Sequence, residues 1–319
     1  MASALVQAIR AQSRSARITW VCGARVQALV RLFDVDDVIV VDDAALLRGS
    51  LPRRLRALMS AFASLAGRRF DLAILAHLDS RYRVLLWPVV ARRTRVWSRV
   101  PALDTNPIPG RSYSDEYARL LDDDPHTHGP VEGHYPLPEI RQRLPAAPED
   151  FGPSSVVLVP GGSRNLLSEE SHRRWPVERY AELAQRLLAA GRRVVIVGDE
   201  GDAWVRSAFD GVPVEDRIGK YVLAETLAVF ANAGTVVSHD TGPLHLARLV
   251  RAPLVALFGP TMPTEFVHPG ARTIVLWGGS RLACRPCYNG RYFARCEDHL
   301  CMKDISVEQV IVAIAAQGA

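Results

Sequence analysis

The sequence has little lysine, because only Lys220 and Lys303 among its 39 basic residues are lysines and the rest are arginines. It contains no apolar run of the roughly 20 residues that a membrane-spanning helix needs. No basic run is interleaved with aromatic residues, and no zinc-finger spacing is present, so a nucleic-acid partner is not expected. The net charge of +5 instead predicts a mildly basic surface, which suits small anionic ligands or phosphorylated lipids at a membrane face.

A length of 319 residues with 48% hydrophobic residues predicts two domains. The best linker candidate is the proline-rich stretch 145–153, which predicts domains at 1–150 and 151–319. The acid-free, arginine-rich start superficially resembles a transit peptide. Its apolar residues Ala4, Leu5, Ala8 and Ile9 also suit an amphipathic helix packed on a sheet, which is the interpretation we favour. A cytoplasmic protein is therefore expected.

Strands and helices alternate along both halves of the chain, which predicts an α/β fold with doubly wound parallel sheets. In the first half we expect strands at 18–22, 38–41, 72–76 and 94–97, and helices at 25–33, 51–65 and 82–90. In the second half we expect strands at 155–159, 194–197, 235–238 and 254–258, and helices up to residue 190, at 223–231, 243–250 and 306–316. Periodicity fades between residues 98 and 150.

A polar turn between two apolar strands is the first candidate site. Asp240 and Thr241 are suited to cap the helix that follows, Gly242 allows close approach of a ligand, and Pro243 suits a first helical turn. The turn presents a helix N-terminus at the carboxyl end of a strand, where an anion such as phosphate binds readily. His245, one step inside the helix, adds a possible donor. The alternative is a well-capped crossover without a ligand.

A second candidate site follows the strand at 155–159. The loop Pro-Gly-Gly-Ser ends at Ser163, and Arg173 and Arg174 precede Trp-Pro at the start of a helix. Arginine binds two phosphate oxygens as a fork, so these side chains suit a diphosphate. The acidic residues Glu200 and Asp202 follow another strand and are candidates for ribose hydroxyls. The alternatives are surface arginines at a helix start and a solvated acidic turn.

These two motifs carry a resemblance to a known family. Asp-Thr-Gly-Pro-Leu-His-Leu-Ala at 240–247 and Ala-Leu-Phe-Gly-Pro-Thr at 256–261 resemble the donor-site signature of the heptosyltransferases. These are inverting glycosyltransferases with the GT-B fold, in which two Rossmann-like domains face a cleft. The resemblance implies a donor domain at 151–319 and an acceptor domain at 1–150. It implies donor-binding roles for Ser163, Arg173, Arg174, Asp240, Thr241, Gly242, Pro243 and His245. His239 stands where asparagine is more usual.

The resemblance implies transfer of a heptose from a nucleotide diphosphate sugar, ADP-heptose, to lipopolysaccharide core or another glycan acceptor. The arginines and the helix N-terminus would stabilise the leaving diphosphate, so no metal cofactor is required. A glycolipid acceptor also implies peripheral contact with the inner membrane. Two alternatives remain open, namely a non-catalytic nucleotide-sugar-binding protein and an epimerase or hydrolase of nucleotide sugars. No catalytic residue is assigned.

The family opens with a strand and a Gly-Asp loop whose aspartate is the expected base, and neither is found at the start of this sequence. We therefore expect the N-terminal domain to lack its first, central strand, which puts the activity of this chain in doubt. Two explanations compete: a start codon placed too far downstream, which we favour, and a degenerate protein. The loss would leave two sheet halves with unpaired backbone groups.

Two clusters of potential metal ligands remain. Cys284, Cys287, Cys296 and Cys301 lie close together in the sequence, and the first pair has the spacing of a zinc knuckle. Structural zinc and free thiols are both compatible with this spacing. His126, His128 and His134 lie among prolines and glycines without fixed partners, so we expect solvated loop histidines.

Overall fold

The structure is a computed structural model. It describes residues 1–77, 79–97, 107–108, 110–121, 138–164, 169–267, 272–289 and 292–317. The chain divides into two compact units, residues 1–134 and 135–319, so the division falls before the proline-rich stretch. That stretch is anchored on the second unit, because Glu149 binds Arg193 and Arg217 there and Phe151 is buried. The predicted α/β class is confirmed in both units.

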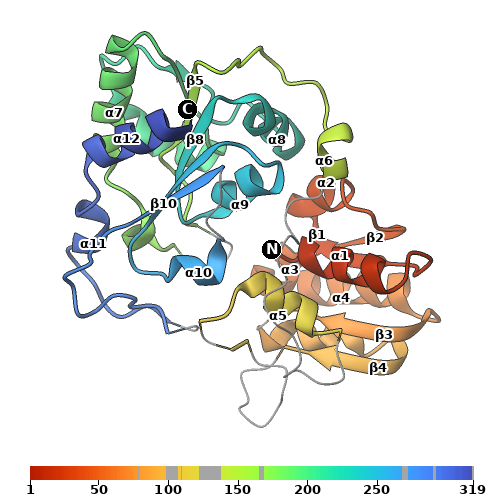
Figure 1. Ribbon diagram of the computed structural model, residues 1–319. Coiled ribbons are helices and arrows are strands. Elements are labelled where there is room, and N and C mark those ends of the chain that lie inside the picture. Colours follow the sequence, from red (N-terminus) through yellow and green to blue (C-terminus); the bar gives the residue numbers. More distant parts are fainter. Residues whose placement is uncertain are drawn as a thin grey trace. The chain divides into compact units, whose positions relative to one another are not determined.

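In the first unit, short strands alternate with helices (Figure 1). Its elements are α1 Ser3–Gln12, β1 Thr19–Gly23, η1 Ala24–Val26, α2 Gln27–Val30, β2 Asp37–Val41, α3 Asp43–Arg48, α4 Leu51–Leu65, β3 Arg69–Leu75, η2 Ser80–Leu86, β4 Val90–Val96 and α5 Tyr113–Arg119. The strands form two separate parallel pairs, β1 with β2 and β3 with β4, and no described strand joins the pairs.

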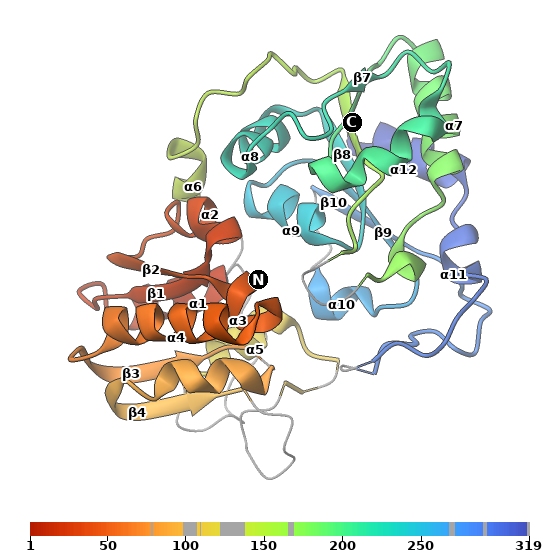
Figure 2. The same ribbon diagram turned by 180° about the vertical axis from the view of Figure 1, so that it is seen from behind.

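The second unit contains one continuous sheet of six parallel strands in the order β10-β9-β8-β5-β6-β7. Its elements are α6 Pro138–Gln142, β5 Ser155–Val159, η3 Ser171–Arg173, α7 Val177–Ala189, β6 Arg193–Ile196, η4 Glu200–Phe209, β7 Glu215–Asp216, α8 Leu223–Asn232, β8 Thr235–His239, α9 Gly242–Leu249, β9 Leu254–Phe258, α10 Pro263–Phe266, β10 Thr273–Trp277, α11 Leu300–Lys303 and α12 Val307–Gln317. Helices cover both faces of the sheet (Figure 2).

The core of the second unit follows from the pattern of these strands. Every residue of β5, β8 and β9 is buried, as expected for parallel strands covered on both faces. One side of the sheet packs on α7 and α12, where Trp175 and Tyr180 are fully buried. Ser306 begins α12 as predicted, because its side chain accepts from the amide of Gln309 and its own amide donates to the Gln309 side chain.

Two predictions in the first unit are wrong. The helix expected at 82–90 is the short 3-10 helix η2, and β4 begins at Val90 rather than near Thr94. Pro88 accounts for the early end of η2, because proline has no backbone N–H to continue a helix. The helices α3 and α5 are additional to the elements predicted for this unit.

Candidate functional site

The two predicted motifs meet at the carboxyl edge of the six-stranded sheet. The loop after β5 and the turn after β8 lie side by side because β5 and β8 are hydrogen-bonded neighbours. The amide of Ser163 donates to Thr241 Oγ1 at 2.8 Å and links the two motifs directly. In open α/β sheets, ligands bind outside the carboxyl ends of the strands, so this edge is where a site is expected.

Gly162 allows this close approach of the two loops. Its φ of +85° lies in the left-handed region that favours glycine. A Cβ atom there would lie 2.6 Å from Thr241 Oγ1. The Gly162 amide donates to Asp202 Oδ1 at 2.9 Å, and the Asp199 amide donates to Asp202 Oδ2 at 3.0 Å. Asp202 therefore holds the glycine loop and the start of η4, so it is engaged within the protein. The exposed Glu200 remains the ribose candidate.

Arg173 points at the turn after β8. Its Nη2 lies 2.9 Å from Asp240 Oδ2, and the same oxygen accepts from Thr261 Oγ1 at 2.7 Å. The guanidinium carbon lies 5.9 Å from the ring centroid of Phe293. Asp240 is only 1% exposed, whereas the Arg173 side chain is partly exposed. The buried carboxylate therefore orients the guanidinium of Arg173. Thr261 was not predicted, although it ends the quoted Gly-Pro-Thr segment.

Arg174 has a different part from its neighbour. Its Nε and Nη2 both donate to the carbonyl of Gly162, at 3.0 and 2.8 Å, and Nη2 also pairs with Glu169 at 2.7 Å. The guanidinium stacks 4.9 Å from the Trp204 ring centroid. Arg174 thus supports the glycine loop, and its predicted donor-binding part stays a prediction.

The expected capping of α9 by side chains is wrong. Thr241 occupies the N-cap position with extended backbone, but neither its side chain nor that of Asp240 accepts from the helix. Thr241 Oγ1 is turned to Ser163 instead, and Asp240 is turned to Arg173 and Thr261. The first turn of α9 therefore keeps backbone donors that no side chain satisfies. Gly242 is exposed, and a Cβ atom added there would meet nothing within 4 Å, so the space in front of these donors is open.

Besides His172 Nε2 and His239 Nε2, four side-chain atoms at this edge are buried without a hydrogen-bond partner in the described structure. They are Ser163 Oγ, Arg173 Nε, Asp240 Oδ1 and His245 Nδ1. Burial without a partner is costly for each of these groups. Such atoms gathered around one helix N-terminus indicate a site shaped for a polar ligand.

Burial lowers the pKa of both His239 and His245 at this edge. His239 Nδ1 lies 3.1 Å from the hydroxyl of Tyr180, and burial, followed by Arg173 and Arg174, lowers its pKa to about 3. Burial also lowers the pKa of His245 well below its usual value. The lowered pKa values favour the neutral form of both rings, so Arg173, Arg174 and the helix N-terminus are the main positive groups at this edge.

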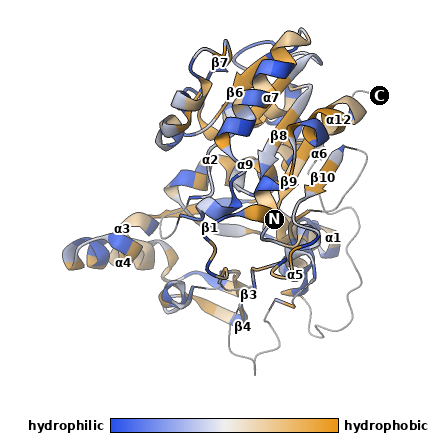
Figure 3. Cartoon of the chain, turned by 90° about the vertical axis from the view of Figure 1, so that its left-hand side faces the viewer, coloured by the Kyte–Doolittle hydropathy of each residue, from blue (hydrophilic) through white to orange (hydrophobic). Residues whose placement is uncertain are grey.

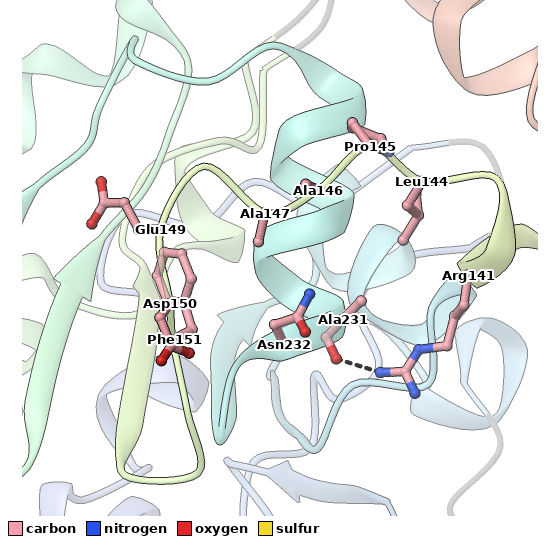
Figure 4. Close-up of a pocket in the computed structure, with 10 residues that line it drawn as sticks. All are labelled: Arg141, Leu144, Pro145, Ala146, Ala147, Glu149, Asp150, Phe151, Ala231 and Asn232. Carbon is pink, nitrogen blue, oxygen red and sulfur yellow. Dashed lines mark hydrogen bonds between the residues drawn. The ribbon is translucent and has the colours of Figure 1, made fainter.

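A cavity of about 620 Å³ lies at the opposite edge of the sheet (Figure 4). It is lined by the segment before β5 and by the end of α8, including Arg141, Phe151 and Asn232. Arg141 donates to the carbonyl of Ala231 across it. Because these residues precede the strands, the cavity lies away from the predicted site and contains none of its residues.

The four cysteines, whose spacing is compatible with both zinc and free thiols, are described by the structure, whereas the three histidines are not. No group of three or more His, Cys, Asp or Glu side chains among the described residues is arranged to hold a metal ion. The thiols of Cys284, Cys287, Cys296 and Cys301 are free, and burial raises the pKa of Cys287 and Cys301. His126, His128 and His134 lie outside the described residues.

Comparisons with known proteins agree with the resemblance. Residues 136–292 match the family model "Glycosyltransferase family 9 (heptosyltransferase)", and all eight predicted site residues lie in this range. The chain is 38% identical over 98 residues to lipooligosaccharide heptosyltransferase 2 of Haemophilus influenzae, covering 28% of each chain. It is 31% identical over 113 residues to lipopolysaccharide heptosyltransferase 2 of Escherichia coli, covering 30% of each. The matched segments thus span less than a third of these curated relatives.

Solved structures share the whole fold. The E. coli heptosyltransferase WaaC with ADP superposes with a TM-score of 0.71 at 17% identity, covering 99% of this chain and 95% of that one. The glycosyl transferase family 9 structure from Veillonella parvula gives a TM-score of 0.70 at 22% identity, covering 99% and 92%. At this level of identity, the likeness shows the fold, which is that of the GT-B heptosyltransferases.

Proposed function

Because residues 136–292 of this chain belong to glycosyltransferase family 9, the heptosyltransferases, we propose that the chain is an inverting glycosyltransferase. The donor is a nucleotide diphosphate sugar, and the acceptor is a lipopolysaccharide-core or other glycan. The observation that carries the proposal is the group of four unpartnered buried polar atoms around the N-terminus of α9. E. coli WaaC structures with ADP and with ADP-2-deoxy-2-fluoro heptose support ADP-heptose as the donor.

In the proposed reaction, the acceptor oxygen forms a bond to the anomeric carbon while the bond from that carbon to the diphosphate oxygen breaks. The electron pair leaves with the nucleoside diphosphate, and the acceptor proton passes to a base. Arg173 and the free donors of α9 are placed to stabilise the charge that develops on the diphosphate. These groups take the part that a divalent metal has in other transferases, so the proposed reaction requires no metal cofactor.

Asp240 is proposed as a positioning residue. A carboxylate would repel a diphosphate, and Asp240 Oδ2 is already engaged by Arg173 and Thr261. It holds the guanidinium in place, and its free Oδ1 is suited to accept from a sugar or ribose hydroxyl. The eight donor-site residues therefore bind and orient the donor, and none of them is assigned as the base.

The donor site is tested by calorimetry with ADP, UDP and GDP. ADP is expected to bind with micromolar affinity, and Arg173→Ala is expected to weaken binding by about 1–3 kcal/mol, or roughly 5- to 150-fold. Arg186→Ala is the matched control, because Arg186 lies on α7 in an exposed ion pair with Glu308. A folded chain that binds none of the three nucleotides would contradict the proposal.

Product analysis separates transfer from the alternatives. Incubation with ADP-heptose and a lipopolysaccharide-core acceptor is expected to give the sugar on the acceptor, with inverted anomeric configuration. Nucleotide binding without any product would instead support a non-catalytic nucleotide-sugar-binding protein. Free sugar or an epimer would support a hydrolase or epimerase.

We further propose that the acceptor is lipid-linked and that the protein contacts the cytoplasmic face of the inner membrane peripherally. None of the helices formed by the described residues has the length and hydropathy needed to span a bilayer.

A further inference from the structure

The outer side of α4 in the first unit carries large apolar residues that no other described residue of that unit buries. Leu51, Leu55 and Met59 are 70%, 52% and 71% exposed and are spaced four residues apart, so they form one stripe along the helix. Ala57, Ala61 and Leu65 are buried on an adjacent side of the helix, about 120° from the centre of the stripe. A helix that is apolar on two sides is expected to be buried on both.

Arginines flank this stripe. From residue 44 to residue 70 the chain contains six arginines and no acidic residue. Arg53 and Arg56 are exposed on α4 itself, and neither has an ion-pair partner in the described structure. Figure 3 shows hydrophobic and hydrophilic residues mixed along α4. The mixture of exposed leucine, methionine and arginine on one helix is typical of helices that lie in a membrane interface.

The neighbouring helix η2 extends the same surface. A small, mainly apolar cavity of about 170 Å³ separates the two helices. Leu55 and Leu58 line it from α4, and Tyr82 and Leu85 line it from η2. Arg54 and Arg81 also lie at this cavity. The only acidic partner of Arg81 in the described structure is Asp79, two residues away.

We propose that the surface formed by α4 and η2 docks on a bilayer that contains anionic phospholipid. The Leu51, Leu55 and Met59 side chains enter the headgroup region, and Arg53 and Arg56 bind lipid phosphates. Each basic residue near an anionic bilayer contributes about 1 kcal/mol, roughly a fivefold change in partitioning, so charge complementarity selects this occupant. The inference deepens the proposed function, because it names the surface that meets the membrane of a lipid-linked acceptor.

The test uses the full chain and phospholipid vesicles that contain no glycolipid acceptor and no donor. Wild-type protein is expected to co-sediment with phosphatidylcholine vesicles that contain about one-third phosphatidylglycerol, and to remain in the supernatant with pure phosphatidylcholine. Binding should weaken at high salt, because the charges at an exposed surface are screened. Equal binding to both vesicles, or to neither, would overturn the proposal.

Two variants locate the surface. Leu55→Ser/Met59→Ser and Arg53→Glu/Arg56→Glu are each expected to reduce vesicle binding about tenfold or more. The matched control is Val312→Ser/Arg281→Glu, which changes one exposed apolar residue and one exposed arginine in the second unit and should leave binding unchanged. Thermal unfolding of each variant verifies the fold.

The remaining outcomes also decide the proposal. If the arginine variant loses binding but the Leu55/Met59 variant does not, insertion of the apolar stripe is wrong. If sedimentation velocity shows a dimer that the same variants dissociate, the surface binds a second copy and the proposal is overturned. ADP binding is measured separately on the same samples, so a failure of the donor site is distinguishable from a failure of the membrane surface.

Discussion

The two units use the same alternation of strands and helices, but only the second has a continuous sheet. In the second unit β5 is hydrogen-bonded on both edges, to β6 and β8, and all its residues are buried. In the first unit each described strand pairs on one edge only, and no residue of β3 is buried. Burial in a parallel sheet therefore depends on neighbours at both edges as much as on the apolar sequence of the strand.

The difference has a functional consequence. The donor motifs lie on the loops after β5 and β8, and these loops are held in register by the central ladder of the continuous sheet. A site that depends on 2.8–2.9 Å contacts between two loops needs such a rigid base. In the first unit, by contrast, α4 carries the exposed apolar stripe of Leu51, Leu55 and Met59.

The largest expected effect is on the stability of the two sheets. Leu158→Ala in β5 removes a fully buried side chain and is expected to destabilise the second unit by about 2–5 kcal/mol. Leu72→Ala in β3 removes a half-buried side chain and should cost about 1 kcal/mol. Hydrogen exchange with peptide resolution measures the protection of backbone amides in the two units separately. Equal losses of protection in β5 and β3 would show that the described division of the first sheet does not weaken it.

A smaller effect is expected from paired glycine substitutions. Gly162→Ala combines a positive φ with a Cβ 2.6 Å from Thr241 Oγ1, so about 2–3 kcal/mol of stability should be lost. Gly67→Ala in the first unit also has a positive φ, but nothing lies within 4 Å of the added Cβ, so about 1 kcal/mol is expected. Only Gly162→Ala should weaken ADP binding. Thermal unfolding and calorimetry of the two variants test this, and an unchanged ADP affinity for Gly162→Ala would remove the glycine loop from the site.

The sequence predicts the second unit better than the first, for a physical reason. The strands predicted at 155–159 and 254–258 have the bounds that the structure shows. Short, continuous apolar runs bounded by glycine or proline fit a buried strand better than a helix. Near residues 82–90, apolar residues fit a helix, a 3-10 turn and a strand, and Pro88 decides between them. Local patterns do not determine such a segment.

The site shows the same limit at the level of side chains. Glycines and arginines at the sheet edge are visible in the sequence because of their backbone freedom and charge. The partners of Asp240, Thr241 and Asp202 are not visible, because each of these side chains has several possible donors nearby. In the structure, Asp240 pairs with Arg173 and accepts from Thr261. Thr241 accepts from the Ser163 amide, and Asp202 accepts from the Gly162 amide.

The smallest expected effect is a difference in how the stability of the two units falls at low pH. It concerns one carboxyl group in each unit, Asp79 in the first and Glu149 in the second. The hydrogen bond from Arg217 lowers the pKa of Glu149 to about 2, and the one from Arg81 lowers the pKa of Asp79 to about 2. A folded-state pKa below the unfolded value means that the stabilisation is complete above the unfolded pKa, about 4.5 for glutamate, and is lost as the pH falls toward 2.

The two carboxyl groups should nevertheless differ. Arg81 is two residues from Asp79, so their contact persists in the unfolded chain, whereas Glu149 and Arg217 are 68 residues apart and meet only on folding. Glu149→Gln is therefore expected to remove about 1–2 kcal/mol of stability at neutral pH and none near pH 2, after allowance for solvent screening. Asp79→Asn, the matched variant in the first unit, should change little. Urea unfolding between pH 2 and pH 7 measures both, and parallel pH profiles for wild type and Glu149→Gln would show that this ion pair does not anchor the segment before β5.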